Sequence, residues 1–380
     1  MKIHFQRFMR IIPARRTATW ILVLLFIPVH NINAQILKDT ATLNLITRGI
    51  KDIYNRQFKD ADEVYNTLVQ SYPEHPIKFL YKGMMIYWEN YPLLPSSPAR
   101  VPFEESLRRC IELCEKNKVE SYAPEMTLAN LCARGLLLLF FADNDLSNEV
   151  TPLAIGTYPP LKRSFRLTSV CSDFYYFTGV YNYYREAYPT IYPIYKAVAF
   201  LFPAGNMEKG LKELEISGQS SIALRAESYF MLYWIWLNFE NNFDQALHYC
   251  KTLNDKYPMN YMYKAMYIKN LLLLKKYDDA EKFIASNSEK ESNSFYLAQL
   301  LIFNGIIQEK KYHNYAFAQD YYKKGINDIS MFATYGNEFI AYGYFGLSRI
   351  GEINGDNHEK RLNRRRAMDL VDFKKVNFDE

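Results

Sequence analysis

Two sixteen-residue stretches, far apart in the chain, share one pattern of residue types. Residues 58–73 read FKDADEVYNTLVQSYP and residues 243–258 read FDQALHYCKTLNDKYP. Phe is first, Ala fourth and Leu eleventh in both, and both end in Tyr-Pro. Such a match restricts the fold, because self-similarity along a chain is typical of repeat architectures.

The shared pattern fits one face of an α-helix. Ala61, Tyr65 and Leu68 are spaced i, i+4 and i+7, and the same spacing recurs from Ala246. Alanine on that face lets a neighbouring helix approach closely. The closing Tyr-Pro predicts a helix end, because proline disfavours helical geometry in the residue before it.

Further units place a small residue at the same position. Ala280 follows Ala246 by 34 residues, Ala318 follows 38 residues later, and Gly210 precedes Ala246 by 36. Helix pairs that repeat about every 34 residues are typical of an α-solenoid. The sequence therefore predicts an all-α chain of stacked helix hairpins.

These residues resemble the tetratricopeptide repeat (TPR) family. In that family a proline follows the small residue by twelve positions, as in Ala61 to Pro73 and Ala246 to Pro258. The resemblance implies a right-handed α-solenoid of TPR-like hairpins over 35–380, with a concave groove. Residues 76–220 fit the repeat less closely, and part of them loosely resembles TPR-like proteins related to the inclusion-body clearance family.

The first 34 residues have the features of a signal peptide. A basic start precedes an apolar run, Trp20 to Val29, and a small residue, Ala34, precedes the expected cut. A ten-residue core is shorter than the roughly 20 residues that a membrane span needs. We therefore expect an exported 35–380 chain, in the periplasm or outer cell envelope of a bacterium, without a transmembrane segment.

Charge then argues against nucleic acid as a partner. The chain has 46 basic and 41 acidic residues, and five basic residues lie in the first 34, which leaves 41 of each sign. A formally neutral chain exerts no long-range attraction on polyanions. A basic run at 360–366 lies among acidic residues and is expected to belong to a solvated capping helix near 357–373.

Catalytic and metal-binding patterns are absent from the sequence. None of the histidines has a second ligand at metal-site spacing. The stretch from Asp143 begins like a calcium loop, but Asn148 replaces the turn glycine and Ala154 the bidentate glutamate. Cys110 and Cys114 form an apolar stripe with their neighbours, which packing explains. We therefore expect no enzyme activity, no metal and no cofactor.

Aromatic residues are the remaining unusual feature, with 32 Tyr and 25 Phe. Burial between helices accounts for most of them, but tyrosines and amides on one face of a solenoid could line a groove. The resemblance to peptide-binding TPR domains suggests that Asn side chains would hold a peptide backbone there. The candidate groove residues are Tyr181, Asn182, Tyr184, Asn238 and Lys269.

The sequence thus predicts a non-catalytic scaffold that binds a peptide or partner protein in its concave groove. The alternative is an envelope protein that binds glycans on aromatic platforms, as outer-surface TPR-like proteins of some bacteria do.

Overall fold

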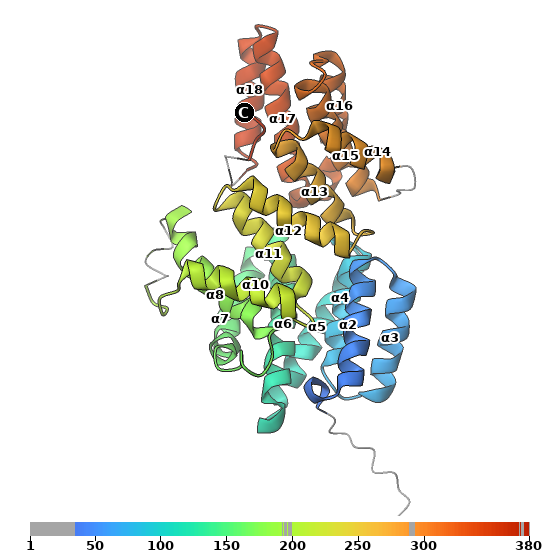
Figure 1. Cartoon of the computed structure of the whole chain (residues 1–380), viewed down its shortest axis with the longest axis vertical. Helices are drawn as coiled ribbons and strands as arrows, with labels where there is room; N and C mark the ends of the chain where they lie inside the picture. The colour runs from blue at the N-terminus through green and yellow to red at the C-terminus, as the bar shows by residue number, and fades with distance from the viewer. Residues whose placement is uncertain are drawn as a thin grey trace, which may run out of the picture.

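The computed structural model describes residues 35–191, 193, 196, 200–288, 293–371, 373 and 376–379. The predicted signal peptide, residues 1–34, lies outside this range. The described residues form α-helices and short 3-10 helices with no β-strand, which confirms the all-α prediction. Figure 1 shows the helices stacked along the long axis of the molecule.

The described helices follow one another along the chain. In the first half they are α2 (Thr40–Tyr54), α3 (Phe58–Ser71), α4 (Ile77–Glu89), α5 (Arg100–Lys116), α6 (Ala123–Asp143), α7 (Ser147–Ser164) and α8 (Phe174–Ile191). In the second half they are α10 (Met207–Ser220), α11 (Arg225–Asn238), α12 (Phe243–Lys256), α13 (Tyr261–Leu273), α14 (Tyr277–Ser288), α15 (Ser294–Lys310), α16 (Tyr315–Ile329), α17 (Asn337–Ile353) and α18 (Asn357–Met368). The 3-10 helices are η1 (Ile36–Lys38), η2 (Glu120–Tyr122) and η4 (Ser330–Gly336).

The two matching stretches fold alike. They form α3 and α12, and both helices end directly before the Tyr-Pro pair. Tyr72 has φ −134° and ψ 57°, and Tyr257 has φ −133° and ψ 62°. The predicted helix ends are therefore confirmed, with the same backbone corner at both places.

The period is visible in the backbone as well. Four helices carry one of the recurring alanines Ala61, Ala246, Ala280 and Ala318. In each case a residue with left-handed φ lies five positions before the alanine. These residues are Arg56, Asn241, Lys275 and His313, with φ of 60°, 52°, 58° and 55°. Their spacing repeats that of the alanines, so the same backbone corner precedes each of these four helices.

The small residues lie at tight helix contacts. Ala61, Ala246, Ala280 and Ala318 are fully buried. At Gly210, a Cβ atom would lie 2.7 Å from the backbone nitrogen of Tyr183, so α8 and α10 approach too closely for a larger side chain. The predicted role of these positions at helix interfaces is confirmed.

Each helix packs mainly on its neighbours in the sequence, and several also contact the next helix but one. Contacts of the second kind join α2 to α4, α4 to α6, α13 to α15 and α15 to α17. The expected capping helix is α18, which packs on α17 and ends at Met368, before the predicted limit of 373. In the region that begins like a calcium loop, residues 144–146 form a turn and residues 147–154 lie in α7.

Contacts also join parts of the chain that are far apart in the sequence. The ring of Tyr54, the last residue of α2, lies 5.0 Å from Trp88, 5.1 Å from Tyr257 and 6.1 Å from Tyr263. Asn260 Nδ2 donates a hydrogen bond to the carbonyl oxygen of Tyr54 at 3.0 Å. In a simple solenoid each repeat meets only its neighbours, whereas here the first helix pair also meets α12 and α13 (Figure 1).

A second long-range contact joins the end of α6 to η4. The Asn144 amide donates to the Tyr335 hydroxyl at 3.4 Å, and Thr334 donates to the carbonyl oxygen of Asp143. The ring of Tyr91 lies 5.8 Å from that of Tyr335 and 6.4 Å from that of Phe295. Besides the direct packing of α8 on α10 and α11, the first half therefore contacts the second half near Tyr54 and near Tyr335.

One helical segment, Glu120–Asp143, is long and apolar enough to cross a membrane by length and composition alone. It comprises η2 and α6, and 61% of its most apolar window is buried against other helices of the protein. Burial of this kind is equally typical of a core helix in a globular protein.

Substitution at an alanine slot tests the helix face. Because Ala246 is fully buried and His248 is exposed, Ala246→Phe should lower the free energy of unfolding by about 1–3 kcal/mol. His248→Phe should change it by less than about 0.5 kcal/mol. Urea melts of the two variants give both values, and equal losses would contradict the assignment of the face.

The contact at Tyr54 also predicts a pH dependence. Tyr54 donates its hydroxyl to Glu227, whose other oxygen, Oε2, is enclosed without a hydrogen bond from a described residue. Burial raises the pKa of Glu227 to about 7 from its ordinary value of 4.5, although the Tyr54 hydrogen bond lowers it and the charge of Asp173 raises it further. The folded chain therefore holds a proton that the unfolded chain has released, and stability should fall as pH rises from 4.5 through about 7.

Glu227→Gln isolates this contribution, because the amide accepts from Tyr54 but does not ionise. Burial raises the pKa of Asp143 to about 7 as well, so Asp143 contributes a fall in the same direction. Chemical melts between pH 5 and 8 should show a smaller loss of stability in Glu227→Gln than in the parent, and the smallest loss in Glu227→Gln/Asp143→Asn. Parallel curves for parent and double variant would contradict the assignment.

Candidate functional site: a cleft between two corners of the chain

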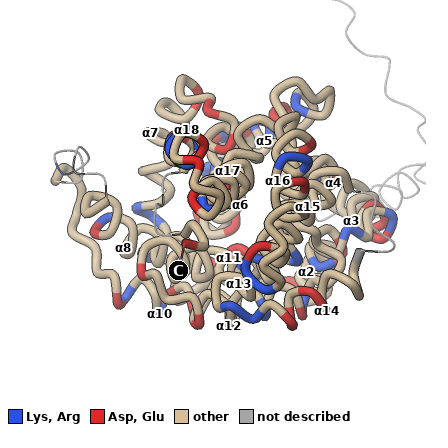
Figure 2. Tube along the Cα trace, turned by 90° about the horizontal axis from the view of Figure 1, so that it is seen from above, with Lys and Arg blue, Asp and Glu red and all other residues tan. Residues whose placement is uncertain are grey.

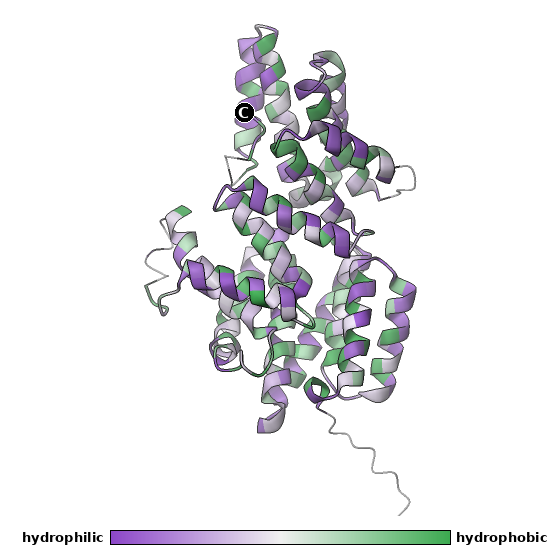
Figure 3. Cartoon of the chain, in the orientation of Figure 1, coloured by the Kyte–Doolittle hydropathy of each residue, from purple (hydrophilic) through white to green (hydrophobic). Residues whose placement is uncertain are grey.

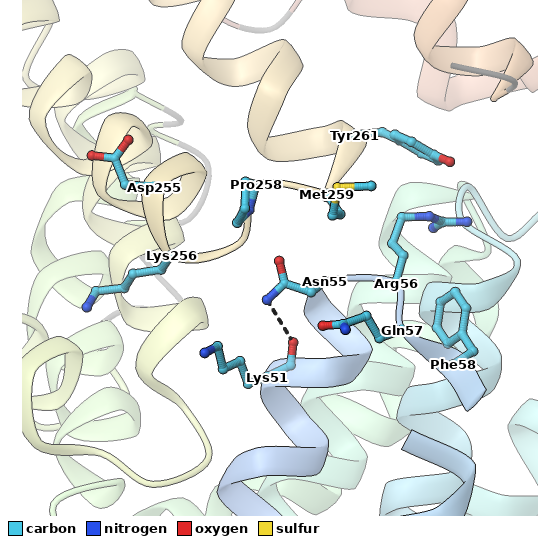
Figure 4. A pocket seen from close by; sticks show the side chains of 10 residues that line it. All are labelled: Lys51, Asn55, Arg56, Gln57, Phe58, Asp255, Lys256, Pro258, Met259 and Tyr261. Carbon is cyan, nitrogen blue, oxygen red and sulfur yellow. Dashed lines mark hydrogen bonds between the residues drawn. The ribbon is translucent and has the colours of Figure 1, made fainter. Parts of the chain in front are cut away.

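A pocket of about 730 Å³ lies where the α2–α3 corner faces the α12–α13 corner (Figure 4). The contact at Tyr54 brings these two corners together. Ten residues line the pocket: Lys51, Asn55, Arg56, Gln57 and Phe58 on one side, and Asp255, Lys256, Pro258, Met259 and Tyr261 on the other.

The α2–α3 corner is a tight helix end. The Arg56 amide donates to the Ile53 carbonyl at 3.0 Å, and the Gln57 amide donates to the Asp52 carbonyl at 2.8 Å. This hydrogen-bond pattern with a left-handed residue is the Schellman motif, in which glycine is usual. Arginine at this position costs roughly 1–2 kcal/mol of backbone strain.

Contacts of its side chain offset the strain at Arg56. Nη1 donates to the Trp88 carbonyl oxygen at 2.9 Å. The guanidinium carbon lies 4.3 Å from the ring centre of Tyr261 and 5.3 Å from that of Phe58. Figure 4 shows the group between these two rings, which come from opposite sides of the pocket. Arg56 therefore joins the two corners by hydrogen bonding and cation–π attraction.

Asn55 carries an unsatisfied polar atom on the pocket floor. The side chain is 6% exposed, and its Nδ2 donates to the Lys51 carbonyl oxygen at 3.2 Å. Oδ1 accepts no hydrogen bond from a described residue, and Figure 4 shows it directed toward Pro258. A buried acceptor without a donor costs about 1–3 kcal/mol, so a donor at this point would stabilise the site.

The charge around the pocket is mainly positive. Lys51 and Lys256 are exposed, and neither forms an ion pair with a described residue. The acid on the lining, Asp255, pairs with Lys251. In Figure 2, Lys and Arg alternate with Asp and Glu over the rest of the trace, so this is a local imbalance on a surface of mixed charge.

The start of α3 adds backbone donors on the same side. Asn242 and Asn314 cap α12 and α16 with their side chains, but Gln57 does not cap α3. The first amides of α3 thus lack the side-chain acceptor that the equivalent helices have, and a helix N-terminus favours negative charge. Figure 3 shows α12, on the opposite wall, as predominantly hydrophilic.

Two of the predicted groove residues are buried and paired. Asn182 is buried in α8 and donates to Glu213 Oε2 of α10 at 2.8 Å. Lys269 is buried in α13, and its Nζ lies 2.9 Å from Glu338 Oε1 of α17. The prediction that these two side chains face an open groove is wrong, because each spans a contact between helices.

The other three candidates do not line the pocket either. The Tyr181 hydroxyl donates to the Pro203 carbonyl oxygen at 2.6 Å. Tyr184 packs edge-on against Phe239 at 5.1 Å, beside buried Asn238, whose Nδ2 donates to no described residue. The structure therefore packs Tyr184 against the residue that follows Asn238 but does not gather the five candidates at one site.

Groups that could support chemistry are dispersed. Among the described residues, no cluster of three or more His, Cys, Asp or Glu side chains could hold a metal ion. The five cysteines are unpaired. A hydrogen bond with Cys114 and burial raise the pKa of the Cys110 thiol, and burial raises that of Cys132, so neither is an activated thiolate.

Comparison with known proteins found no match to this chain. No family model matches it, and no curated protein matches it in sequence.

Asn182→Ala distinguishes a packing role from a binding role. Because the substitution removes a buried donor to Glu213, we expect a loss of about 1–3 kcal/mol in the free energy of unfolding. Tyr181→Phe, one residue away, removes a more exposed hydrogen bond and should cost less than about 1 kcal/mol. Unchanged thermal stability of Asn182→Ala would restore Asn182 as a groove candidate.

Proposed function

We propose that this chain is a non-catalytic binding scaffold, a right-handed α-solenoid of TPR-like hairpins that holds a peptide or a segment of a partner protein. The observation that carries the proposal is the cleft between the two corners. It is wide, and it presents an unsatisfied acceptor and two unpaired cations. The backbone corner that recurs before four of the helices supports the solenoid assignment.

A peptide fits the cleft better than a sugar does. Glycan sites commonly use an exposed aromatic face, but both aromatic rings of the lining, Phe58 and Tyr261, already contact the Arg56 guanidinium. A polypeptide needs hydrogen-bonding groups and charge more than a free ring face. We therefore retain glycan binding as the alternative outcome of the experiment.

Site-specific photocrosslinking in the native host tests the proposal. A photoreactive amino acid replaces Met259, which is 56% exposed on the pocket rim, or Val119, which is 54% exposed between α5 and α6 and does not line the pocket. We expect a protein adduct, identified by mass spectrometry, at position 259 and none at 119.

Other adducts would count against a protein partner. An adduct at 259 that resists protease but yields to glycosidases would support the glycan alternative. Equal labelling at both positions would show non-specific contact and contradict the cleft as the binding site.

We also propose that the scaffold works outside the cytoplasm, in the periplasm or outer envelope. The support is the sequence of residues 1–34 alone. Mass analysis of the protein from its native host should find an amino terminus at or near Gln35. An intact Met1 on protein in the cytosolic fraction would contradict export.

A further inference from the structure

The cleft lining combines positive charge with a buried acceptor, and the combination limits the ligand. Lys51, in the last turn of α2, and Asn55, the residue directly after that helix, both line the pocket, while Lys256 lies on the opposite wall at the end of α12 (Figure 4). Anionic groups on a ligand in the pocket would be attracted by both lysines. A ligand without N–H or O–H donors, however, would leave Asn55 Oδ1 unsatisfied.

We infer that the cleft binds an acidic peptide segment, whose side-chain carboxylates meet Lys51 and Lys256 while a backbone N–H donates to Asn55 Oδ1. This inference rests on the proposed function and adds the chemistry of the ligand. A peptide supplies carboxylates and amide donors together at short spacing. A fully deprotonated inorganic anion such as sulfate supplies charge without the donor, and a basic peptide supplies the donor with the wrong charge.

The remaining charges around the cleft agree with this assignment. Arg56 adds a third cation, held between Tyr261 and Phe58, and the uncapped start of α3 adds backbone donors. Asp255 opposes an acidic ligand, but Lys251 neutralises it. The balance therefore favours negative charge at the pocket, although the surface as a whole has mixed charge.

The lysines are exposed, so their contribution to affinity should be moderate and sensitive to salt. Exposed ion pairs contribute roughly 0.2–1 kcal/mol each. Loss of both lysine contacts should therefore weaken binding by roughly two- to thirtyfold. Added salt should reduce the same contribution in the parent protein, because surface charges are screened over about 10 Å at 0.1 M.

Fluorescence polarisation with defined peptides tests the inference on the full chain. The probe is a short peptide of alternating Glu and Ser, amidated at its carboxyl end and labelled with fluorescein, whose own negative charge is the same in every peptide compared. Counterparts with Gln or Lys in place of Glu have the same length. We expect the Glu peptide to bind most tightly, the Gln peptide more weakly and the Lys peptide weakest.

Variants locate the binding. Lys51→Gln/Lys256→Gln should raise the Kd for the Glu peptide by roughly two- to thirtyfold and leave the Kd for the Gln peptide nearly unchanged. Lys323→Gln/Lys324→Gln, on α16, removes two exposed lysines that do not line the pocket, and it should bind like the parent. Asn55→Ala should weaken the Glu and Gln peptides alike, in protein whose helical circular dichroism is unchanged.

Several results would overturn the inference. Equal affinity for the Glu, Gln and Lys peptides would do so, as would equal effects of the two double-lysine variants. Competition by inorganic sulfate at the same concentration as the Glu peptide would show that an anion without a donor suffices.

The experiments distinguish failure of this inference from failure of the proposed function. A protein crosslink at position 259 that survives in Lys51→Gln/Lys256→Gln, without selectivity for the Glu peptide, overturns the acidic ligand alone. Absence of any crosslink at 259 overturns the scaffold proposal and the inference together.

Discussion

The contact of Tyr54 with the α12–α13 corner fixes how the two walls of the cleft are arranged. Its ring packs against Trp88 on one side and against Tyr257 and Tyr263 on the other, and its hydroxyl reaches Glu227. Burial of an aromatic side chain of this size contributes several kcal/mol, at about 25 cal/mol per Å² of apolar surface. Since Tyr54 directly precedes Asn55 and Arg56, this contact fixes the position of one wall of the cleft.

This long-range contact brings together corners that a simple repeat array keeps apart. When each unit meets only its neighbours, the backbone corners between helices remain apart along the edge of the array. Here the bond from Asn260 to the Tyr54 carbonyl joins the corner after α12 to the end of α2. Two corners that hold different positions in the repeat thus face each other, and their polar residues form one lining.

Local features could be predicted from the sequence, whereas contacts between distant residues could not. The alanine slots and the Tyr-Pro helix ends depend on residues within one or two turns, and they were confirmed. The partners of Asn182 and Lys269 lie 31 and 69 residues away, so nothing near either residue showed that it would be buried and paired. The cleft was missed for the same reason, because its walls are about 200 residues apart in the sequence.

The high aromatic content of this chain favours a binding site at a corner between helices over one on a helix face. Several tyrosines are fully buried, including Tyr183, Tyr233 and Tyr322, so the helix faces pack into one another. Amides and charges on those faces then need partners across the interface, as Glu213 and Glu338 provide. At a corner between two helices the chain changes direction, so fewer of its side chains pack between neighbouring helices. Polar residues such as Lys51 and Lys256 therefore stay exposed without an ion pair to a described residue, and they remain available to a ligand.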